Sequence, residues 1–220
     1  MSIRPIKFAP NENYHIYNRG VNKMNIFIDH NDYDRFMKLM YVSNSTTNKK
    51  FTDIETSPGK AWTLEKDSDL VDIVSYCLMP NHFHFILREK IENGISIFMH
   101  RLSTSYSMYF NKKYDRNGAL FQGKFKSEHI NNDNYFKYLF SYIHLNPIKL
   151  IQKDWKEIGI KNIDVAQKYL LKYPYSSFLD IIEKINRIES KIINKLSIPN
   201  YFGSPENFKK EIFDWLIVKI

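Results

Sequence analysis

The amino-acid sequence predicts an α+β fold, a small sandwich in which helices pack on an antiparallel sheet. Short aromatic or apolar runs of strand length alternate with longer segments whose apolar residues recur at helical spacing. The expected order of elements is strand, helix, strand, strand, helix, strand, helix. Each element is supported by a local pattern of residues.

The first half of the chain contains a strand, a helix and two strands that follow each other closely. The helix at 32–41 has apolar residues at helical spacing. The segment 43–69 is polar, and we interpret it as a loop or variable insertion with a short strand near 61–64. Strands are expected at 14–17, 71–78 and 82–87, with turns at 18–20 and 79–81.

The second half continues with a helix, a strand and a further helix, and then becomes mostly helix-like from Trp155 onward. Asn146 is the expected end of the last of these helices, because the residue before a proline avoids the α region. We therefore divide the chain into a domain at 1–150 and a helical C-terminal extension at 151–220. The expected elements are a helix at 94–111, a strand within 120–129 and a helix at 134–145.

Length and composition fit a globular protein. The chain has 220 residues, of which 43% are hydrophobic and 25% charged, so there is enough apolar material for a core. No apolar run approaches the roughly 20 residues that span a bilayer, and the first residues lack the apolar segment of a signal peptide. A cytoplasmic location without a membrane partner is therefore expected. The single cysteine, Cys77, excludes an internal disulfide and an all-thiolate zinc site.

The chain is basic, and its positive charge is dense in one stretch. Lys and Arg number 32 against 24 Asp and Glu, which gives a net charge of +8 and favours polyanionic partners such as nucleic acid. Aromatic residues are interleaved with the cations of residues 101–130, as in surfaces that track phosphates and stack bases, although a solvated surface explains the pattern as well. The cations are Arg101, Lys112, Lys113, Arg116, Lys124 and Lys126.

Two histidines separated by one residue form the sharpest chemical feature. On a strand, His82 and His84 project to one face, and Phe83 and Phe85 project to the other, toward the core. Two imidazoles placed in this way can hold one metal ion. An isolated pair of this kind is more often two polar residues on a solvated strand, so the pattern needs partners.

Partners are offered by the end of the helix at 134–145. Tyr142 and Asn146 are four positions apart and share a helix face, whereas His144 faces elsewhere. The Asn146 carbonyl oxygen is a plausible third metal ligand at a helix C-terminus, where the partial negative charge favours a cation. The Tyr142 phenol is a candidate nucleophile, although ordinary core packing would explain a lone tyrosine.

Other chemistries find less support. Zinc bound by Cys77 with His82 and His84 lacks a fourth ligand. No Gly-x-Ser-x-Gly motif indicates a serine hydrolase, and no P-loop indicates a nucleotide cofactor.

The chain resembles the IS200-like transposases, and among them most closely the REP-associated tyrosine transposases. The resemblance rests on five blocks that occur in the family's order and cover about residues 12 to 178. The blocks are residues 14–20, 76–84, 118–126, 142–147 and 174–177.

This resemblance implies a ferredoxin-like HUH endonuclease domain, that is, an antiparallel sheet with helices packed on it, which cleaves and rejoins single-stranded DNA containing a hairpin. The family's metal ligands fall on His82, His84 and Asn146, and its nucleophile falls on Tyr142, with Mg²⁺ or Mn²⁺ as the expected ion. The product would be a 5′-phosphotyrosine. Arg19, in the first block, joins the cations above as a candidate DNA contact.

Two other functions remain open at this stage. One is a domesticated DNA-hairpin-binding protein without catalysis, and the other is an RNA-binding regulator, which does not explain His82, His84 and Tyr142 together. The family allows a monomer or a homodimer.

Overall fold

The computed structural model describes residues 7–47, 60–182 and 186–215. Its centre is a four-stranded antiparallel sheet with the order β2-β3-β1-β4. Together with two helices, the strands follow the chain order β1-α1-β2-β3-α2-β4 of the ferredoxin-like fold, which confirms the predicted class. The elements are β1 (Asn13–Arg19), α1 (His30–Ser43), β2 (Val71–Met79), β3 (His82–Glu89), α2 (Gly94–Lys113) and β4 (Lys126–His129).

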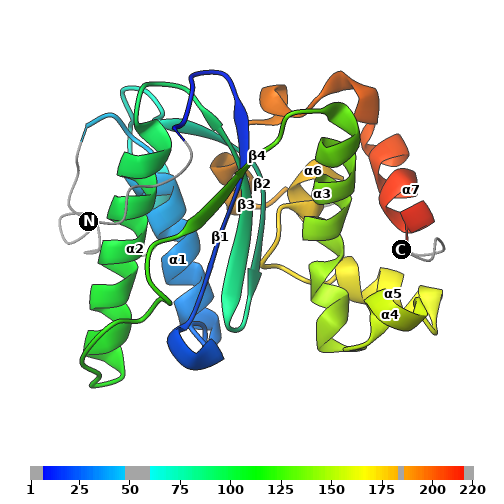
Figure 1. Ribbon diagram of the computed structural model, residues 1–220, viewed down its shortest axis with the longest axis horizontal. Helices are drawn as coiled ribbons and strands as arrows, with labels where there is room; N and C mark the ends of the chain where they lie inside the picture. Colours follow the sequence, from blue (N-terminus) through cyan, green and yellow to red (C-terminus); the bar gives the residue numbers. More distant parts are fainter. Residues whose placement is uncertain (1–6, 48–59, 183–185, 216–220) are drawn as a thin grey trace.

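Helices cover both faces of the sheet (Figure 1). The helices α1 and α2 pack together on one face, while α3 and the C-terminal helices lie on the other. The second group consists of α3 (Asp133–Leu145), α4 (Trp155–Ile158), α5 (Ile163–Leu170), α6 (Phe178–Ile181) and α7 (Pro205–Trp215). Short 3₁₀ helices are η1 (Val21–Lys23), η3 (Lys60–Thr63), η4 (Asn146–Leu150), η5 (Ile188–Ile192), η6 (Lys195–Ser197) and η7 (Asn200–Phe202).

The alternation of β3 separates a core face from a polar face. Phe83 and Phe85 are fully buried, and both rings pack against Phe36 of α1. His82 and His84 project to the opposite face, where the His84 ring meets Tyr142 of α3. The predicted division of this strand is therefore confirmed.

Residues after α5 complete the outer edge of β2. The amide of Leu78 donates to the carbonyl of Tyr175, and the amide of Ser177 donates to the carbonyl of Tyr76. The hydroxyl of Tyr173 donates to the carbonyl of Leu78 at 2.6 Å. These bonds occupy backbone groups that an open sheet edge would leave exposed, and the C-terminal residues share the same hydrophobic core as the sheet.

One local prediction was wrong. The short strand expected near 61–64 is the 3₁₀ helix η3, in which Ala61 packs on Val42 at the end of α1. The mostly helical region expected from Trp155 onward is confirmed, and it consists of short helices separated by turns. Part of the proposed insertion, residues 48–59, lies outside the described residues. In the described part of the chain, no helix combines the length and apolar character needed for a membrane span.

Candidate functional site

The sheet register gathers the two histidines with groups from β1. His82 lies opposite Arg19, and His84 lies opposite Tyr17. Residues opposite each other on an antiparallel pair project to the same face. The two imidazole rings are 5.1 Å apart between centroids, at nearly a right angle.

In each imidazole, the Nδ1 atom forms a hydrogen bond with another side chain of the protein. Nδ1 of His82 lies 2.6 Å from Oδ1 of Asn81, and Nδ1 of His84 lies 2.9 Å from Nε2 of His15. Because Asn81 offers a carbonyl oxygen there, Nδ1 of His82 is the proton donor. We likewise place the proton of His84 on Nδ1, where it is donated to Nε2 of His15. In both rings the lone pair of Nε2 is then available to a ligand.

The helix α3 brings the other two predicted residues to the same place. Its first turn is capped by the Asn132 side chain, which accepts from the amide of Tyr135. At its other end, the Tyr142 ring meets His84 edge to face, with centroids 5.7 Å apart. Asn146 is 2% exposed, and its side chain lies close enough to His82 to raise the pKa of that imidazole, against the larger effect of burial. The structure thus unites His82, His84, Tyr142 and Asn146.

Contacts on several sides hold the Tyr142 ring. The Tyr138 ring, one turn earlier on α3, is nearly parallel to it with centroids 6.2 Å apart. The Lys156 ammonium lies 3.8 Å from the Tyr142 ring centroid, which is a cation–π contact. Lys156 belongs to the short helix α4, in which the neighbouring Trp155 is buried.

Burial keeps the histidines of this site neutral at physiological pH. It lowers the pKa of His82 to about 4, and the positive charge of Lys149 acts in the same direction. Burial also places the pKa of His84 well below its ordinary value, with His15 adding to the effect. For His15, burial lowers the pKa to about 4, although the charge of Glu128 opposes the shift. Neutral imidazoles have the lone pairs that metal binding needs.

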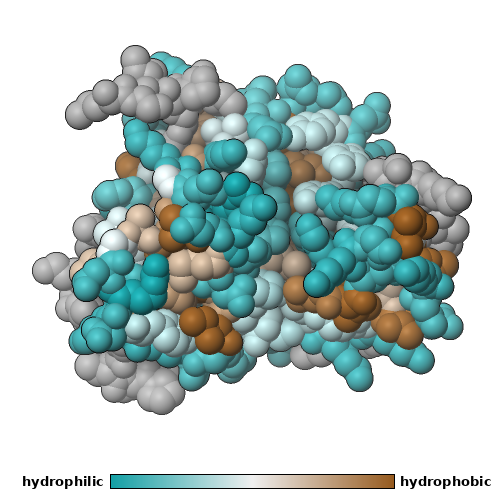
Figure 2. All heavy atoms as spheres, turned by 60° about the horizontal axis from the view of Figure 1, so that its bottom comes forward, coloured by the Kyte–Doolittle hydropathy of each residue, from teal (hydrophilic) through white to brown (hydrophobic). Residues whose placement is uncertain are grey.

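A wide, positively charged cleft of about 920 Å³ opens at the two histidines. Its lining includes Leu150, which is 42% exposed and adds apolar surface to the cleft. Hydrophilic side chains cover most of the face shown in Figure 2, with hydrophobic patches between them. The cations that line the cleft are Arg19, Lys23, Lys126, Lys149 and Lys153.

The predicted DNA-binding residues divide into two groups. Arg19 and Lys126 line the cleft, and Lys124 belongs to the segment just before β4. The other four lie on α2 or in the turn after it. The helix α2 packs on the face of the sheet opposite to the one that carries α3. These four residues are Arg101, which donates to the carbonyl of Ser45, Lys112, Lys113, and Arg116, which donates to the side chain of Asn111.

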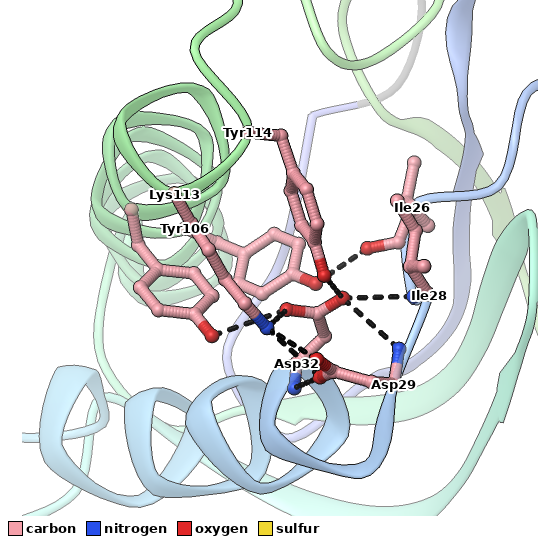
Figure 3. A network of polar contacts seen from close by, with 8 residues as sticks. Ile26, Ile28, Asp29, Asp32, Tyr106, Lys113 and Tyr114 are labelled. Atoms are coloured by element: carbon pink, nitrogen blue, oxygen red, sulfur yellow. Dashed lines mark hydrogen bonds and ion pairs between the residues drawn. The ribbon is translucent and has the colours of Figure 1, made fainter.

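Lys113 has a structural role that its sequence context does not reveal (Figure 3). Its ammonium donates to Asp29 at 2.8 Å and to Asp32 at 2.7 Å. Asp32 is fully buried and also accepts from the hydroxyls of Tyr109 and Tyr114. The network ties the end of α2 to the first turn of α1, where Asp29 and Asp32 form a capping box.

Sequence reasoning missed several groups at the site. Three lysines follow the predicted ligand Asn146 within ten residues, namely Lys149, Lys153 and Lys156. This basic run was the sequence signal that could have indicated cations at the site. Lys23 belongs to η1, directly after β1. His15 stands in one of the blocks of the family resemblance, but no role was predicted for it.

The donor set fits a divalent metal ion. Among the described residues, no group of three or more His, Cys, Asp or Glu side chains is arranged to hold a metal. Two imidazoles and the Asn146 amide give a mixed nitrogen and oxygen set, which suits Mn²⁺ and, less well, Mg²⁺.

Comparisons with known proteins agree with the family resemblance of the sequence motifs. Residues 60–146 match the family described as "Transposase IS200 like". No curated protein matches the chain. A solved REP-associated tyrosine transposase bound to a REP hairpin shares the fold with a TM-score of 0.51 and 14% identity, over 86% of this chain and 90% of that one.

A bacterial tRNA(His) guanylyltransferase (Thg1)-like protein in complex with ATP is also similar. The match covers 76% of this chain and 70% of that one, at 10% identity and with a TM-score of 0.38. The resemblance to the IS200-like transposases that the sequence motifs predict is therefore confirmed by the match over residues 60–146 and by the shared fold.

Proposed function

We propose that the protein is a transposase that cleaves and rejoins hairpin-containing single-stranded DNA through a 5′-phosphotyrosine. The observation that carries this proposal is the meeting of Tyr142 with His84, and of Asn146 with His82, at the edge of a cationic cleft. Hairpin DNA is proposed as the substrate because the REP-associated relative was solved with a REP hairpin.

The cleft binds the DNA backbone, and α3 presents the nucleophile. Lys126 and Lys149 lie in the cleft to contact phosphates near the histidines. Oη of Tyr142 forms a bond to phosphorus while the bond from phosphorus to the 3′ oxygen breaks. The phenol proton passes, overall, to that 3′ oxygen. The new ester conserves the phosphodiester bond, so rejoining to another strand needs no nucleotide cofactor.

The histidines and Asn146 prepare the site for a cation. The hydrogen bonds at Nδ1 orient both rings, and the lowered pKa values keep them unprotonated. A divalent ion held by His82, His84 and Asn146 would supply positive charge for the scissile phosphate. Tyr142 is held beside the histidines by its contacts with Tyr138 and Lys156.

A covalent-adduct assay tests the proposal. The protein is mixed with a labelled single-stranded hairpin oligonucleotide and Mn²⁺ and is run on a denaturing gel. We expect a band of protein joined to DNA, which Tyr142→Phe abolishes without loss of affinity. Tyr138→Phe is the matched control because its ring lies on the same helix, beside Tyr142.

The competing function is a DNA-hairpin-binding protein without catalysis. It predicts binding of the same oligonucleotide with no adduct in Mn²⁺ or Mg²⁺. An adduct that persists in Tyr142→Phe would instead reject Tyr142 as the nucleophile.

A further inference from the structure

His15 is buried on β1 in contact with a proposed metal ligand. It is 6% exposed, and its Nε2 lies 2.9 Å from Nδ1 of His84. The two rings are nearly parallel, with centroids 5.1 Å apart.

The register of the sheet places His15 next to residues of both neighbouring strands, β3 and β4. His15 lies opposite Glu128 of β4, and Tyr17 lies opposite His84 of β3. His15 is therefore the diagonal neighbour of His84 and the direct neighbour of Glu128 on the same face. Glu128, His15 and His84 therefore form a row across the sheet, and His84 at its end lines the cleft.

The carboxylate at the far end of this line is itself fixed. Oε1 of Glu128 accepts from the Tyr17 hydroxyl at 2.9 Å, and Oε2 accepts from the Tyr135 hydroxyl at 2.8 Å. Oε2 lies 3.9 Å from Nδ1 of His15. That Nδ1 atom is buried and has no hydrogen-bond partner among the described residues, so Glu128 is its nearby electrostatic partner.

These positions define where the protons lie. Nδ1 of His84 can donate to Nε2 of His15 only when His15 carries its own proton on Nδ1, the atom that faces Glu128. The negative charge of Glu128 favours that tautomer. His84 then carries its proton on Nδ1 and keeps the lone pair of Nε2 free.

A second buried histidine shows what a purely structural arrangement looks like. Nδ1 of His144 lies 2.8 Å from the carbonyl oxygen of Phe140, and Nε2 lies 2.8 Å from the hydroxyl of Ser177. Both of its nitrogens are satisfied by neighbours that do not reach the cleft. His15 differs because its side-chain hydrogen bond is to a residue of the site.

We propose that His15 is a positioning residue, which with Glu128 fixes the tautomer and ring orientation of His84 so that His84 can bind a divalent metal ion. The inference rests on the proposed function, since His84 is a metal ligand only there. Partners that orient a ligating histidine typically contribute 10- to 100-fold to metal affinity. Without an acceptor at His15, Nδ1 of His84 would lose its buried partner, and the ring would be free to rotate or to change tautomer.

Manganese binding by the full chain without DNA tests this directly. Free Mn²⁺ is followed by electron paramagnetic resonance during titration of wild type, His15→Phe and His15→Gln, with His84→Ala as the reference for a lost site. His15→Phe removes the acceptor, and we expect about 10- to 100-fold weaker binding. The Gln side chain keeps a carbonyl acceptor, so we expect affinity within a few-fold of wild type. His129→Gln, at an exposed histidine paired with Glu12, is the matched control.

A second measurement avoids dependence on the folding of His15→Phe. In wild type, long-range ¹H–¹⁵N spectra should assign the His84 proton to Nδ1, with the His84 signals identified by their absence in His84→Ala. A proton on Nε2 of His84 overturns the inference. Equal Mn²⁺ affinity of wild type and His15→Phe also overturns it but leaves the proposed function intact. If wild type binds Mn²⁺ no better than His84→Ala, both the inference and the proposed metal site fail.

Discussion

The buried His144 predicts how the stability of the fold depends on pH. Its side chain has no exposed surface, and burial lowers its pKa to about 3. An unfolded histidine has a pKa of about 6.5. Between these two values the unfolded chain binds a proton that the folded chain does not. The free energy of unfolding therefore falls as the pH falls below about 6.5.

The size of this effect follows from the two pKa values. At pH 5 the unfolded histidine is almost fully protonated while the folded one remains neutral, which costs about 2 kcal/mol of stability relative to pH 7.5. His82 and His15, with pKa values lowered to about 4, add to the slope of the wild type. A variant of His144 alone isolates its share.

Urea unfolding of wild type and His144→Gln at pH 7.5 and at pH 5 measures that share. The variant is expected to be less stable at pH 7.5, since the hydrogen bonds to Phe140 and Ser177 are altered, but to lose about 2 kcal/mol less on acidification. His100→Gln, at an exposed position of α2, should keep the slope of the wild type. Equal slopes for His144→Gln and wild type would refute the reasoning.

Three substitutions of lysine separate structural, binding and positioning roles. Lys113→Met should lower the free energy of unfolding by about 3 kcal/mol, because it leaves buried Asp32 without its cation, and should leave the salt dependence of DNA affinity unchanged; a shallower salt dependence would place Lys113 on the DNA. Lys149→Met should reduce the slope of log affinity against log salt by about 0.7 if Lys149 meets one phosphate of a single strand, and an unchanged slope would exclude that contact. Lys156→Met should slow adduct formation about 5-fold at saturating DNA, because it removes a cation–π contact worth about 1 kcal/mol from Tyr142. Lys153→Met is its control, and equal rates of Lys156→Met and wild type would show that the contact does not position the ring.

The sequence predicted the fold well where local patterns decide the structure. The alternation of β3 placed Phe83 and Phe85 in the core because a strand has a period of two. The end of α3 at Leu145 was predicted correctly, but the reason was wrong, because Asn146 keeps αR backbone angles and the chain continues through Pro147 into η4. Ala61 and Trp62 were mistaken for a strand because a short apolar run fits either a strand or a 3₁₀ turn, and packing on the end of α1 decides between them.

The candidate site was only partly predictable, since much of it depends on contacts between distant segments. The charge of Lys113 was visible, but its partner Asp32 lies 81 positions earlier, and only the packing of α2 on α1 brings them together. The position of Lys156 above Tyr142 likewise depends on how the chain turns back after η4. The link from Glu128 to His84 requires the sheet order, which local patterns do not specify.

The central claim is that the Tyr142 hydroxyl forms a covalent bond with DNA. Protease digestion of the adduct formed with a hairpin oligonucleotide, followed by mass spectrometry, identifies the residue that carries the 5′ phosphate. We predict that the nucleotide is attached to Tyr142. Attachment to any other residue, or a cleaved product with no attached peptide, would contradict the account.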